Sequence, residues 1–344
     1  MGDKQQTLVG AVRRVADGQN LSIEESYQCM DAIMSGEATD AQIAGFITAL
    51  RMKGETVEEI TGCARAMREK ATRIDAGDSP HLVIDTCGTG GDTSGTFNIS
   101  TAAALVAAGA GVRVAKHGNR SVSSQSGSAD VLKTLGVNIE ADQPIVERCL
   151  REANIGFLYA PMLHAAMKYA IGPRRQLGLR TVFNILGPLT NPAGAPCQVL
   201  GVYDAALTAV ISRVLGNLGS RRCFVVHADD GLDEISNTGP THVAELAEGE
   251  VREYVIRPDD FGLEVSAMSD LVVASPEESA AAVRSVLAGE AGPRRDIVLL
   301  NAAAGIAASG AASDIAAGLP LAVKAVDDGA ATEALEKLIA ISNA

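Results

Sequence analysis

The chain has 344 residues, of which 47% are hydrophobic and 21% charged, so it is long enough for two globular domains with substantial cores. Its net charge of −13, the absence of Trp and an aromatic content of 3% argue against a nucleic-acid-binding protein. It has no run of 18 apolar residues and no apolar leader stretch, and its six cysteines are scattered without a C-x-x-C pair. These features predict a cytoplasmic protein with reduced thiols and no membrane-spanning segment.

The first 75 residues predict helices only. Three capping boxes mark helix starts, since a hydroxyl can accept the third backbone N–H while the third side chain returns to the cap. These boxes are Ser22 with Glu25, Thr39 with Gln42, and Thr56 with Glu59. Gly36 and Gly54 stand where the first two of these helices should end. We expect a small all-helical N-terminal domain.

After residue 81 short apolar runs alternate with Ala-rich stretches, which is typical of a mostly parallel central sheet with crossover helices. The predicted strands are Leu82–Ile84, Val112–Ala115, Ile155–Tyr159, Val199–Tyr203, Cys223–His227 and Ile297–Leu300. The stretch 164–190 interrupts this alternation, and we expect it to return to the helical domain, with hinges near residues 75 and 190. The predicted domains are residues 1–75 with about 164–190, and an α/β domain of residues 76–163 and 191–344.

A glycine-rich segment, DTCGTGGDTSGTFNIST at residues 85–101, directly follows the first predicted strand. Without β-carbons its backbone amides can converge on an anion, and Asn98, Ser100 and Thr101 open a helix whose N-terminus attracts phosphate. It lacks the lysine of a nucleotide-binding P-loop, and Thr93 stands where the dinucleotide fingerprint requires glycine. On its own this segment fits an anion site or a plain tight turn.

A second polar segment, KHGNRSVSS at residues 116–124, also follows a predicted strand. Lysine and arginine neutralise phosphate, and short hydroxyl side chains supply further donors. Residues 93–129 and 153–203 contain no Asp or Glu; their cations are Arg113, Lys116, Arg120, Lys168, Arg174, Arg175 and Arg180. We expect both windows to contribute to an anion site, although a buried Ala/Gly-rich stretch also lacks charge.

Adjacent carboxylates, Asp233 and Glu234, lie in a loop after a further predicted strand. Mg²⁺ favours one or two carboxylates together with water and substrate phosphates, so the pair fits a magnesium site. By itself the pair also fits an ordinary solvated acidic loop. Nothing in the sequence pairs His117 or His164 with a carboxylate, so we assign proton transfer to neither.

Together these segments resemble the anthranilate phosphoribosyltransferase family, which belongs to the nucleoside phosphorylase/phosphoribosyltransferase superfamily. The resemblance rests on GTGGD at 88–92, FNIST at 97–101, AKHGNRSVSSQSGSADVL at 115–132, LGLRTVFNILGPLTNP at 177–192 and DGLDEIS at 230–236, in the family's order and spacing. It implies transfer of a phosphoribosyl group from phosphoribosyl pyrophosphate to the amine of anthranilate, in tryptophan biosynthesis. It also implies a homodimer formed through the helical domain.

The resemblance also implies the residues of the site. Phosphoribosyl pyrophosphate is expected on Gly88, Gly91, Asp92, Thr96, Asn98, Ile99, Ser100, Thr101, Lys116, His117, Gly118, Asn119, Arg120, Ser121, Val122, Ser123, Ser124 and Ser128. Two Mg²⁺ ions per subunit are expected on Ser100, Asp233 and Glu234. Anthranilate is expected on Gly88, Asn119 and Arg174.

Two residues depart from the pattern or leave it open. Gln125 stands where a basic residue is expected, and Arg175 rather than Arg174 could face anthranilate, although ungapped spacing favours Arg174. Three other functions remain as alternatives: a pyrimidine nucleoside phosphorylase, a phosphoribosyltransferase of the other class with a ribose-binding motif at residues 224–230, and a nucleic-acid-binding relative. The acidic pair and the KHGNRS segment argue against the first, and the acidic composition argues against the last.

Overall fold

The structure is a computed structural model that describes residues 3–90, 94–120 and 127–344. Its N-terminal part, here called the helical unit, consists of α1 (Asp3–Ala16), α2 (Ile23–Met34), α3 (Asp40–Lys53) and α4 (Val57–Lys70). All three predicted capping boxes are present, at the starts of α2, α3 and α4. Each satisfies backbone amides that have no partner within the helix, which explains why these starts are readable from sequence.

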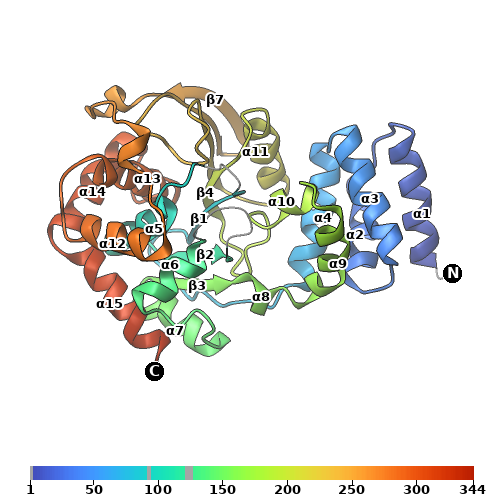
Figure 1. The fold of residues 1–344 in the computed structure, drawn as a ribbon, viewed down its shortest axis with the longest axis horizontal. Helices are drawn as coiled ribbons and strands as arrows, with labels where there is room; N and C mark the ends of the chain where they lie inside the picture. The colour runs from blue at the N-terminus through green and yellow to red at the C-terminus, as the bar shows by residue number, and fades with distance from the viewer. Residues whose placement is uncertain (1–2, 91–93, 121–126) are drawn as a thin grey trace.

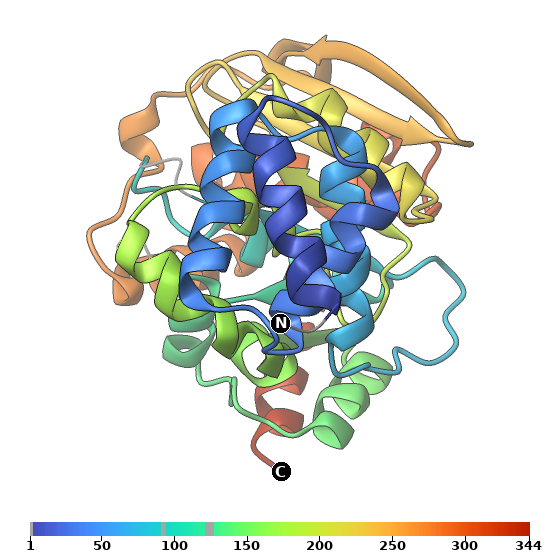
Figure 2. The same cartoon turned by 90° about the vertical axis from the view of Figure 1, so that its right-hand side faces the viewer.

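The chain later returns to the helical unit over residues 160–191, here called the return segment. It contains α8 (Ala160–Leu163), the 3-10 helix η1 (Ala165–Met167), α9 (Lys168–Leu177) and α10 (Val182–Leu186). Helix α9 contacts α2 and α3, and α10 contacts α3 and α4. Buried Val182, Phe183 and Leu186 of α10 belong to the same apolar core as the N-terminal helices. Figure 1 shows α9 and α10 lying against the helical unit, and Figure 2 shows that unit from the front.

A seven-stranded sheet, in the order β3-β2-β1-β4-β5-β6-β7, forms the centre of the α/β unit. Its strands are β1 (Ile84–Gly88), β2 (Val114–Gly118), β3 (Ile155–Tyr159), β4 (Cys197–Gly201), β5 (Arg222–Ala228), β6 (Thr241–Ala247) and β7 (Glu250–Ile256). The five strands from β3 to β5 pair in parallel, while β6 and β7 are antiparallel. The sheet is therefore mixed and mostly parallel, as predicted. Figure 1 shows β3 leading through α8 toward the helical unit, so the carboxyl ends of the parallel strands face that unit.

Helices cover both faces of this sheet. One face carries α5 (Ile99–Gly109) and α13 (Pro293–Ala308), which α6 (Ser128–Leu135), α12 (Pro276–Leu287), α14 (Ile315–Asp327) and α15 (Ala330–Ser342) surround. The other face carries α11 (Leu207–Asn217), which also contacts α4, while α7 (Gln143–Glu152) lies against β3. Phe224 and Val226 of β5 belong to the apolar core that includes α5 and α13. Cys223 and Val225 belong to the core that includes α11 and the helical unit, as the alternation of side chains along a strand requires. Two short 3-10 helices, η2 (Pro258–Phe261) and η3 (Met268–Asp270), lead from β7 to α12.

One strand prediction is wrong, and one pair of strands was not predicted. Ile297–Leu300 lies inside α13, a helix that is buried almost all round, so its sequence shows no polar face to separate it from a buried strand. The hairpin of β6 and β7 was not predicted, because charged and exposed residues interrupt the apolar pattern, above all in the edge strand β7. Among the described residues, no helix combines the length and the apolar character needed to cross a membrane.

Candidate active site

The glycine-rich segment leaves β1 at Gly88 and is fastened to the neighbouring strand β4. The backbone N–H of Thr89 donates to the carbonyl of Gly201 at 2.9 Å, and its hydroxyl accepts the N–H of Tyr203 at 3.1 Å. On its way back the chain forms a bridge between Thr96 and Val272 and enters α5 at Ile99. The described part of the segment therefore lies at the carboxyl ends of β1 and β4; the sequence predicted that it follows β1 but not that it contacts β4. Gly91 and Asp92, which were also predicted to bind here, lie outside the described residues.

The acidic pair lies against this segment. A carboxylate oxygen of Asp233 accepts the N–H of Gly90 at 3.0 Å, and one of Glu234 accepts the N–H of Ser100 at 3.1 Å, at the N-terminus of α5. A β-carbon at Gly88 would overlap the Asp233 carboxylate and displace it, so glycine allows the carboxylate to approach the end of β1 closely. Two amides that we expected to face an anion thus hold the carboxylates instead. This arrangement brings the predicted metal ligands and the predicted phosphate segment into one site.

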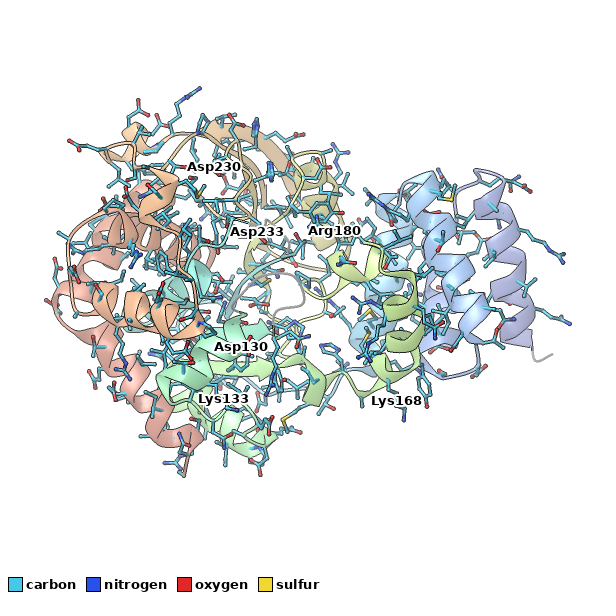
Figure 3. The ribbon with its side chains drawn as sticks, in the orientation of Figure 1. Asp130, Lys133, Lys168, Arg180, Asp230 and Asp233 are labelled. Carbon is cyan, nitrogen blue, oxygen red and sulfur yellow. The ribbon has the colours of Figure 1, made fainter. Side chains whose placement is uncertain are left out.

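The loop that carries Asp233 and Glu234 is hydrogen-bonded to helix α13. Asn301 of α13 accepts the N–H of Ile235 at 2.9 Å and donates to its carbonyl at 2.8 Å. The side chains of Leu232 and Ile235 are fully buried on either side of the pair. In Figure 3, Asp233 lies on the side of the α/β unit that faces the helical unit. The carboxylates are therefore presented by a rigid loop rather than by a solvated one.

The second polar segment begins at the carboxyl end of β2. Lys116 is only 2% exposed, and its ammonium group donates to the carbonyl of Thr86 at 2.6 Å and to the hydroxyl of Ser100 at 3.3 Å. A β-carbon at Gly118 would overlap the hydroxyl of Ser128 and the ring of Phe157, so Ser128 packs directly against this strand end. Lys116 thus lies beneath Ser100 rather than on the surface of the site.

The residues after β2 are only partly described. The side chain of Asn119 accepts the N–H of Arg120 at 2.8 Å, and the Arg120 side chain is half exposed, 4.0 Å from a carboxylate oxygen of Glu140. Ser121, Val122, Ser123 and Ser124 were predicted to bind phosphoribosyl pyrophosphate and lie outside the described residues, as does Gln125.

His117 and His164 form a buried pair whose Nε2 atoms are 3.1 Å apart. Burial lowers the pKa of His117 to about 3 and that of His164 to about 4, so both rings are neutral at physiological pH. The pair joins β2 to the return segment. Sequence reasoning left both histidines without a partner because residues so far apart in sequence cannot be paired from spacing.

The cations of the return segment differ in their surroundings. Arg174 of α9 is half-buried, with its guanidinium 5.0 Å from the ring centre of Phe183, and burial lowers its pKa, whereas Arg175 is exposed. Arg180 stacks on the ring of Tyr203 at 4.5 Å, beside the strand end that holds the glycine-rich segment. In Figure 3, Arg180 lies toward the middle of the molecule, on the helical side of the division between the two units.

Arg113, one of the cations predicted to contribute to the anion site, lies away from the carboxyl ends of the strands. Arg113 precedes β2 at the amino end of the strand, where its guanidinium donates to the carbonyls of Ala76 and Asp78. The absence of carboxylates around it in the sequence reflects burial, not anion binding. The predicted contribution of the whole 93–129 window is in this respect wrong.

The donor set of the acidic pair fits Mg²⁺ better than a metal held by protein ligands alone. In residues 3–90, 94–120 and 127–344, no group of three or more His, Cys, Asp or Glu side chains is arranged to hold a metal ion. Mg²⁺ is commonly held by one or two carboxylates and completes its coordination with water and substrate phosphates.

The helical unit and the α/β unit define the class of protein. Residues 9–71 match the family model described as "Glycosyl transferase family, helical bundle domain", and residues 80–332 match "Glycosyl transferase family, a/b domain". The two-part fold is thus that of this glycosyl transferase family.

Individual relatives narrow this class. An anthranilate phosphoribosyltransferase from Geotalea uraniireducens is 54% identical over 97% of this chain and 99% of its own length. The structure of the Thermus thermophilus enzyme of the same name matches with a TM-score of 0.91 at 43% identity, over 97% of this chain and 99% of its own. The Saccharomyces cerevisiae enzyme in complex with PRPP and Mg matches with a TM-score of 0.88 at 29% identity over 98% of both chains, and another structure of it contains 4-fluoroanthranilate.

The chain belongs to the anthranilate phosphoribosyltransferases of this glycosyl transferase family. The predicted family, the fold class and the anthranilate phosphoribosyltransferase activity in tryptophan biosynthesis are confirmed.

Proposed function

We propose that the carboxyl ends of β1, β2 and β4, with the loop after β5, bind phosphoribosyl pyrophosphate and Mg²⁺ and pass the phosphoribosyl group to anthranilate. The observation that supports this best is the contact of Asp233 and Glu234 with the amides of Gly90 and Ser100. It brings a carboxylate pair suited to Mg²⁺ against a segment suited to phosphate. The yeast relative that contains PRPP and Mg gives independent support.

The proposed phosphoribosyl pyrophosphate site joins both polar segments. Its described members are Gly88, Thr96, Asn98, Ile99, Ser100, Thr101, Lys116, His117, Gly118, Asn119, Arg120 and Ser128; Gly91, Asp92 and residues 121–124 complete it. The N-terminus of α5 contributes a partial positive charge without a P-loop lysine. Lys116 is proposed to act indirectly, because its ammonium group donates a hydrogen bond that orients the hydroxyl of Ser100.

The proposed metal ligands are Asp233, Glu234 and the hydroxyl of Ser100, and we propose two ions per subunit. When bound, Mg²⁺ stabilises the negative charge that develops on the departing pyrophosphate. The chain's own share is to orient the carboxylates through backbone amides and to hold the ribose and pyrophosphate in line.

Anthranilate is proposed to bind between Gly88, Asn119 and Arg174. The amine of anthranilate is weakly basic and already neutral, so its attack on the ribose requires positioning more than a general base. The lowered pKa values of His117 and His164 agree with this, because neutral buried rings orient a ligand without exchanging protons near neutral pH. Burial of Arg174 beside Phe183 favours it over the exposed Arg175 as the partner of the anthranilate carboxylate.

The larger organisation is proposed as follows. The domains divide near residue 75, the return segment belongs with the helical unit, and closure about residues 75 and 190 excludes water from the activated ribose. Two subunits associate through the helical unit, which is supported by exposed Met52 on α3 and exposed Tyr169 and Ile171 on the adjoining α9. A cytoplasmic location stays a prediction.

Turnover of phosphoribosyl pyrophosphate with anthranilate tests this function directly. In the presence of Mg²⁺ we expect the fluorescence of anthranilate to decrease as N-(5-phosphoribosyl)anthranilate and pyrophosphate form. Phosphorolysis of thymidine or uridine without transfer to anthranilate would contradict the proposal.

A further inference from the structure

The turn that follows α10 is buried between the two units. It consists of residues 187–191, here called the junction turn, and leads from α10 toward β4. Pro188, Leu189 and Thr190 are buried, and within the turn the N–H of Thr190 donates to the carbonyl of Gly187 at 3.1 Å. A buried turn cannot leave its other carbonyls to water, so other parts of the chain must supply the donors.

The carbonyl of Leu189 is held from the helical unit. Arg68, in the last turn of α4, donates from Nε to this carbonyl at 2.6 Å. Another nitrogen of the same guanidinium, Nη1, donates at 3.1 Å to the carbonyl of Leu218, where α11 ends. A cation is favoured at the unpaired carbonyls of a helix C-terminus. Arg68 therefore joins α4 both to the junction turn and to the α/β unit.

The preceding carbonyl, that of Pro188, is held from the sheet. Gln198 of β4 is 4% exposed, and its side-chain amide donates to this carbonyl at 2.8 Å and to Sγ of Cys87 at 3.0 Å. Asn191, at the end of the turn, donates to the carbonyl of Ala115 on β2 at 2.7 Å. Two successive carbonyls of the junction turn thus accept hydrogen bonds from different units, one from a helix and one from a strand.

The junction turn continues directly from the part of the return segment that is proposed to meet anthranilate. Helix α10 ends at Leu186, and it carries Phe183, whose ring centre lies 5.0 Å from the guanidinium of Arg174. It also contacts α3 and α4, and Figure 1 shows it between α4 and the sheet. The position of the turn therefore affects where Arg174 lies relative to the strand ends.

We propose that Arg68 and Gln198 are positioning residues for anthranilate: by holding successive carbonyls of the junction turn from the two units, they fix α10 and the Arg174 guanidinium relative to the carboxyl ends of the strands. The proposal rests on the proposed function, because Arg174 is the proposed partner of the anthranilate carboxylate. It gives the GPLTN sequence of the turn a role that the phosphoribosyl pyrophosphate site does not.

Arg68→Met tests the hold from the helical unit. The substitution removes both donors and keeps an unbranched apolar side chain. A displaced Arg174 loses part of its contact, so we expect the KM for anthranilate to rise about 5- to 10-fold, less than when Arg174 itself is removed. The KM for phosphoribosyl pyrophosphate should change less than about two-fold, because its proposed site lies on other elements. Steady-state kinetics with each substrate varied in turn measures both values.

Gln198→Met tests the hold from the sheet with little change of side-chain volume. The donor to Pro188 is lost while the contacts of Arg68 remain, so α10 stays fixed to the helical unit but not to β4. We expect the KM for anthranilate to rise about 3- to 10-fold, as for one lost buried hydrogen bond, and that for phosphoribosyl pyrophosphate to rise less. A rise confined to phosphoribosyl pyrophosphate would show that Gln198 acts through Cys87 and β1, and would overturn its assignment.

Arg65→Met is the matched control for Arg68→Met. Arg65 also lies on α4, but its guanidinium pairs with Glu24 and stacks on the ring of Tyr27 at 4.1 Å, within the helical unit. Its loss should leave both KM values within about two-fold of the original, because exposed ion pairs contribute little. All variants are assayed below their unfolding temperatures. If Arg68→Met then kept the original KM for anthranilate, or raised both KM values equally, Arg68 would be merely structural and the proposal would be overturned.

A double-mutant cycle with Arg174→Ala tests whether Arg68 acts through Arg174. In the Arg174→Ala background, Arg68→Met should change the KM for anthranilate by less than about two-fold, because the side chain that it positions is absent. Multiplicative increases in this KM would overturn the route through Arg174. Failure of the unsubstituted chain to turn over, or equal effects of Arg174→Ala on both KM values, would instead contradict the proposed function.

Discussion

The two ends of the parallel sheet both carry charged side chains but use them differently. At the amino end, Arg222 opens β5 and donates to the carboxylate of Glu245, with N–O distances of 3.0 and 2.8 Å, and to the carbonyls of Ala307 and Ser313. At the carboxyl end, Asp233 and Glu234 accept backbone amides from the glycine-rich segment and from the start of α5. Amino-end charges thus meet opposite charges and carbonyls, whereas at the carboxyl end two carboxylates meet backbone amides, and the ammonium group of Lys116 is buried beneath Ser100.

We therefore expect the charges at the amino end to act on the stability of the fold and those at the carboxyl end to act on function. A cation that already donates to a carboxylate and two carbonyls gains little from binding a ligand. The carboxylates of two adjacent residues, each bound to a backbone amide, add negative charge that a divalent cation can balance. Charge substitutions at the carboxyl end should therefore change turnover, and those at the amino end should change stability.

The largest effect is expected from replacing the acidic pair. Asp233→Asn with Glu234→Gln should lower kcat/KM about 1,000-fold, since metal stabilisation of developing charge is worth several kcal/mol and about 1.4 kcal/mol corresponds to tenfold. The same variant should lose the dependence of turnover on Mg²⁺ concentration. Initial rates over a Mg²⁺ titration give both results, and unchanged activity would refute the metal assignment.

A smaller effect is expected at the anthranilate side. Arg174→Ala should raise the KM for anthranilate about 10- to 50-fold and that for phosphoribosyl pyrophosphate much less, because a hydrogen bond to a charged group contributes about 1.5–3 kcal/mol. Arg175→Ala is the control, since that side chain is exposed, and should leave both KM values nearly unchanged. Equal effects on both substrates would move the anthranilate contact elsewhere.

The smallest effect on turnover is expected at the amino end. Arg222→Met should lower the free energy of unfolding by about 2 kcal/mol, because Glu245 and two carbonyls lose a charged donor. Turnover below the unfolding temperature should stay the same. Denaturant unfolding measures the first and steady-state kinetics the second, with the neighbouring exposed Arg221→Met as the control. If Arg222→Met lowered kcat without lowering stability, the proposed difference between the amino and carboxyl ends of the sheet would be contradicted.

Local patterns in the sequence were enough to predict the helices of the helical unit and to identify both polar segments. Capping boxes and glycine turns act over three or four residues, so they are visible without the fold. The position of Lys116 was not: a cation in a serine-rich segment suggests the surface, yet Lys116 is buried, and its ammonium group donates to the carbonyl of Thr86 and the hydroxyl of Ser100. The acidic residue Asp85 within the apolar run LVIDTCG was the available signal that β1 also holds a buried polar side chain.

Contacts across long sequence separations explain the remaining gaps. The pairing of His117 with His164 and the hydrogen bond from Asn191 to Asp85 depend on strands that meet only in the folded sheet. The predicted strand at Ile297–Leu300 was wrong because a fully buried helix has the same local composition as a buried strand. The edge hairpin was missed because β7 is exposed along most of its length, and its charged residues interrupt the apolar pattern.

The central claim is that the carboxyl end of the sheet carries out metal-dependent phosphoribosyl transfer. The most direct measurement is the decrease of anthranilate fluorescence with phosphoribosyl pyrophosphate, with and without Mg²⁺, for the unsubstituted chain and for the Asp233→Asn, Glu234→Gln double variant. We expect rapid loss of fluorescence only for the unsubstituted chain with Mg²⁺. Equal rates for the two proteins, or no turnover by the unsubstituted chain with Mg²⁺ present, would contradict the claim.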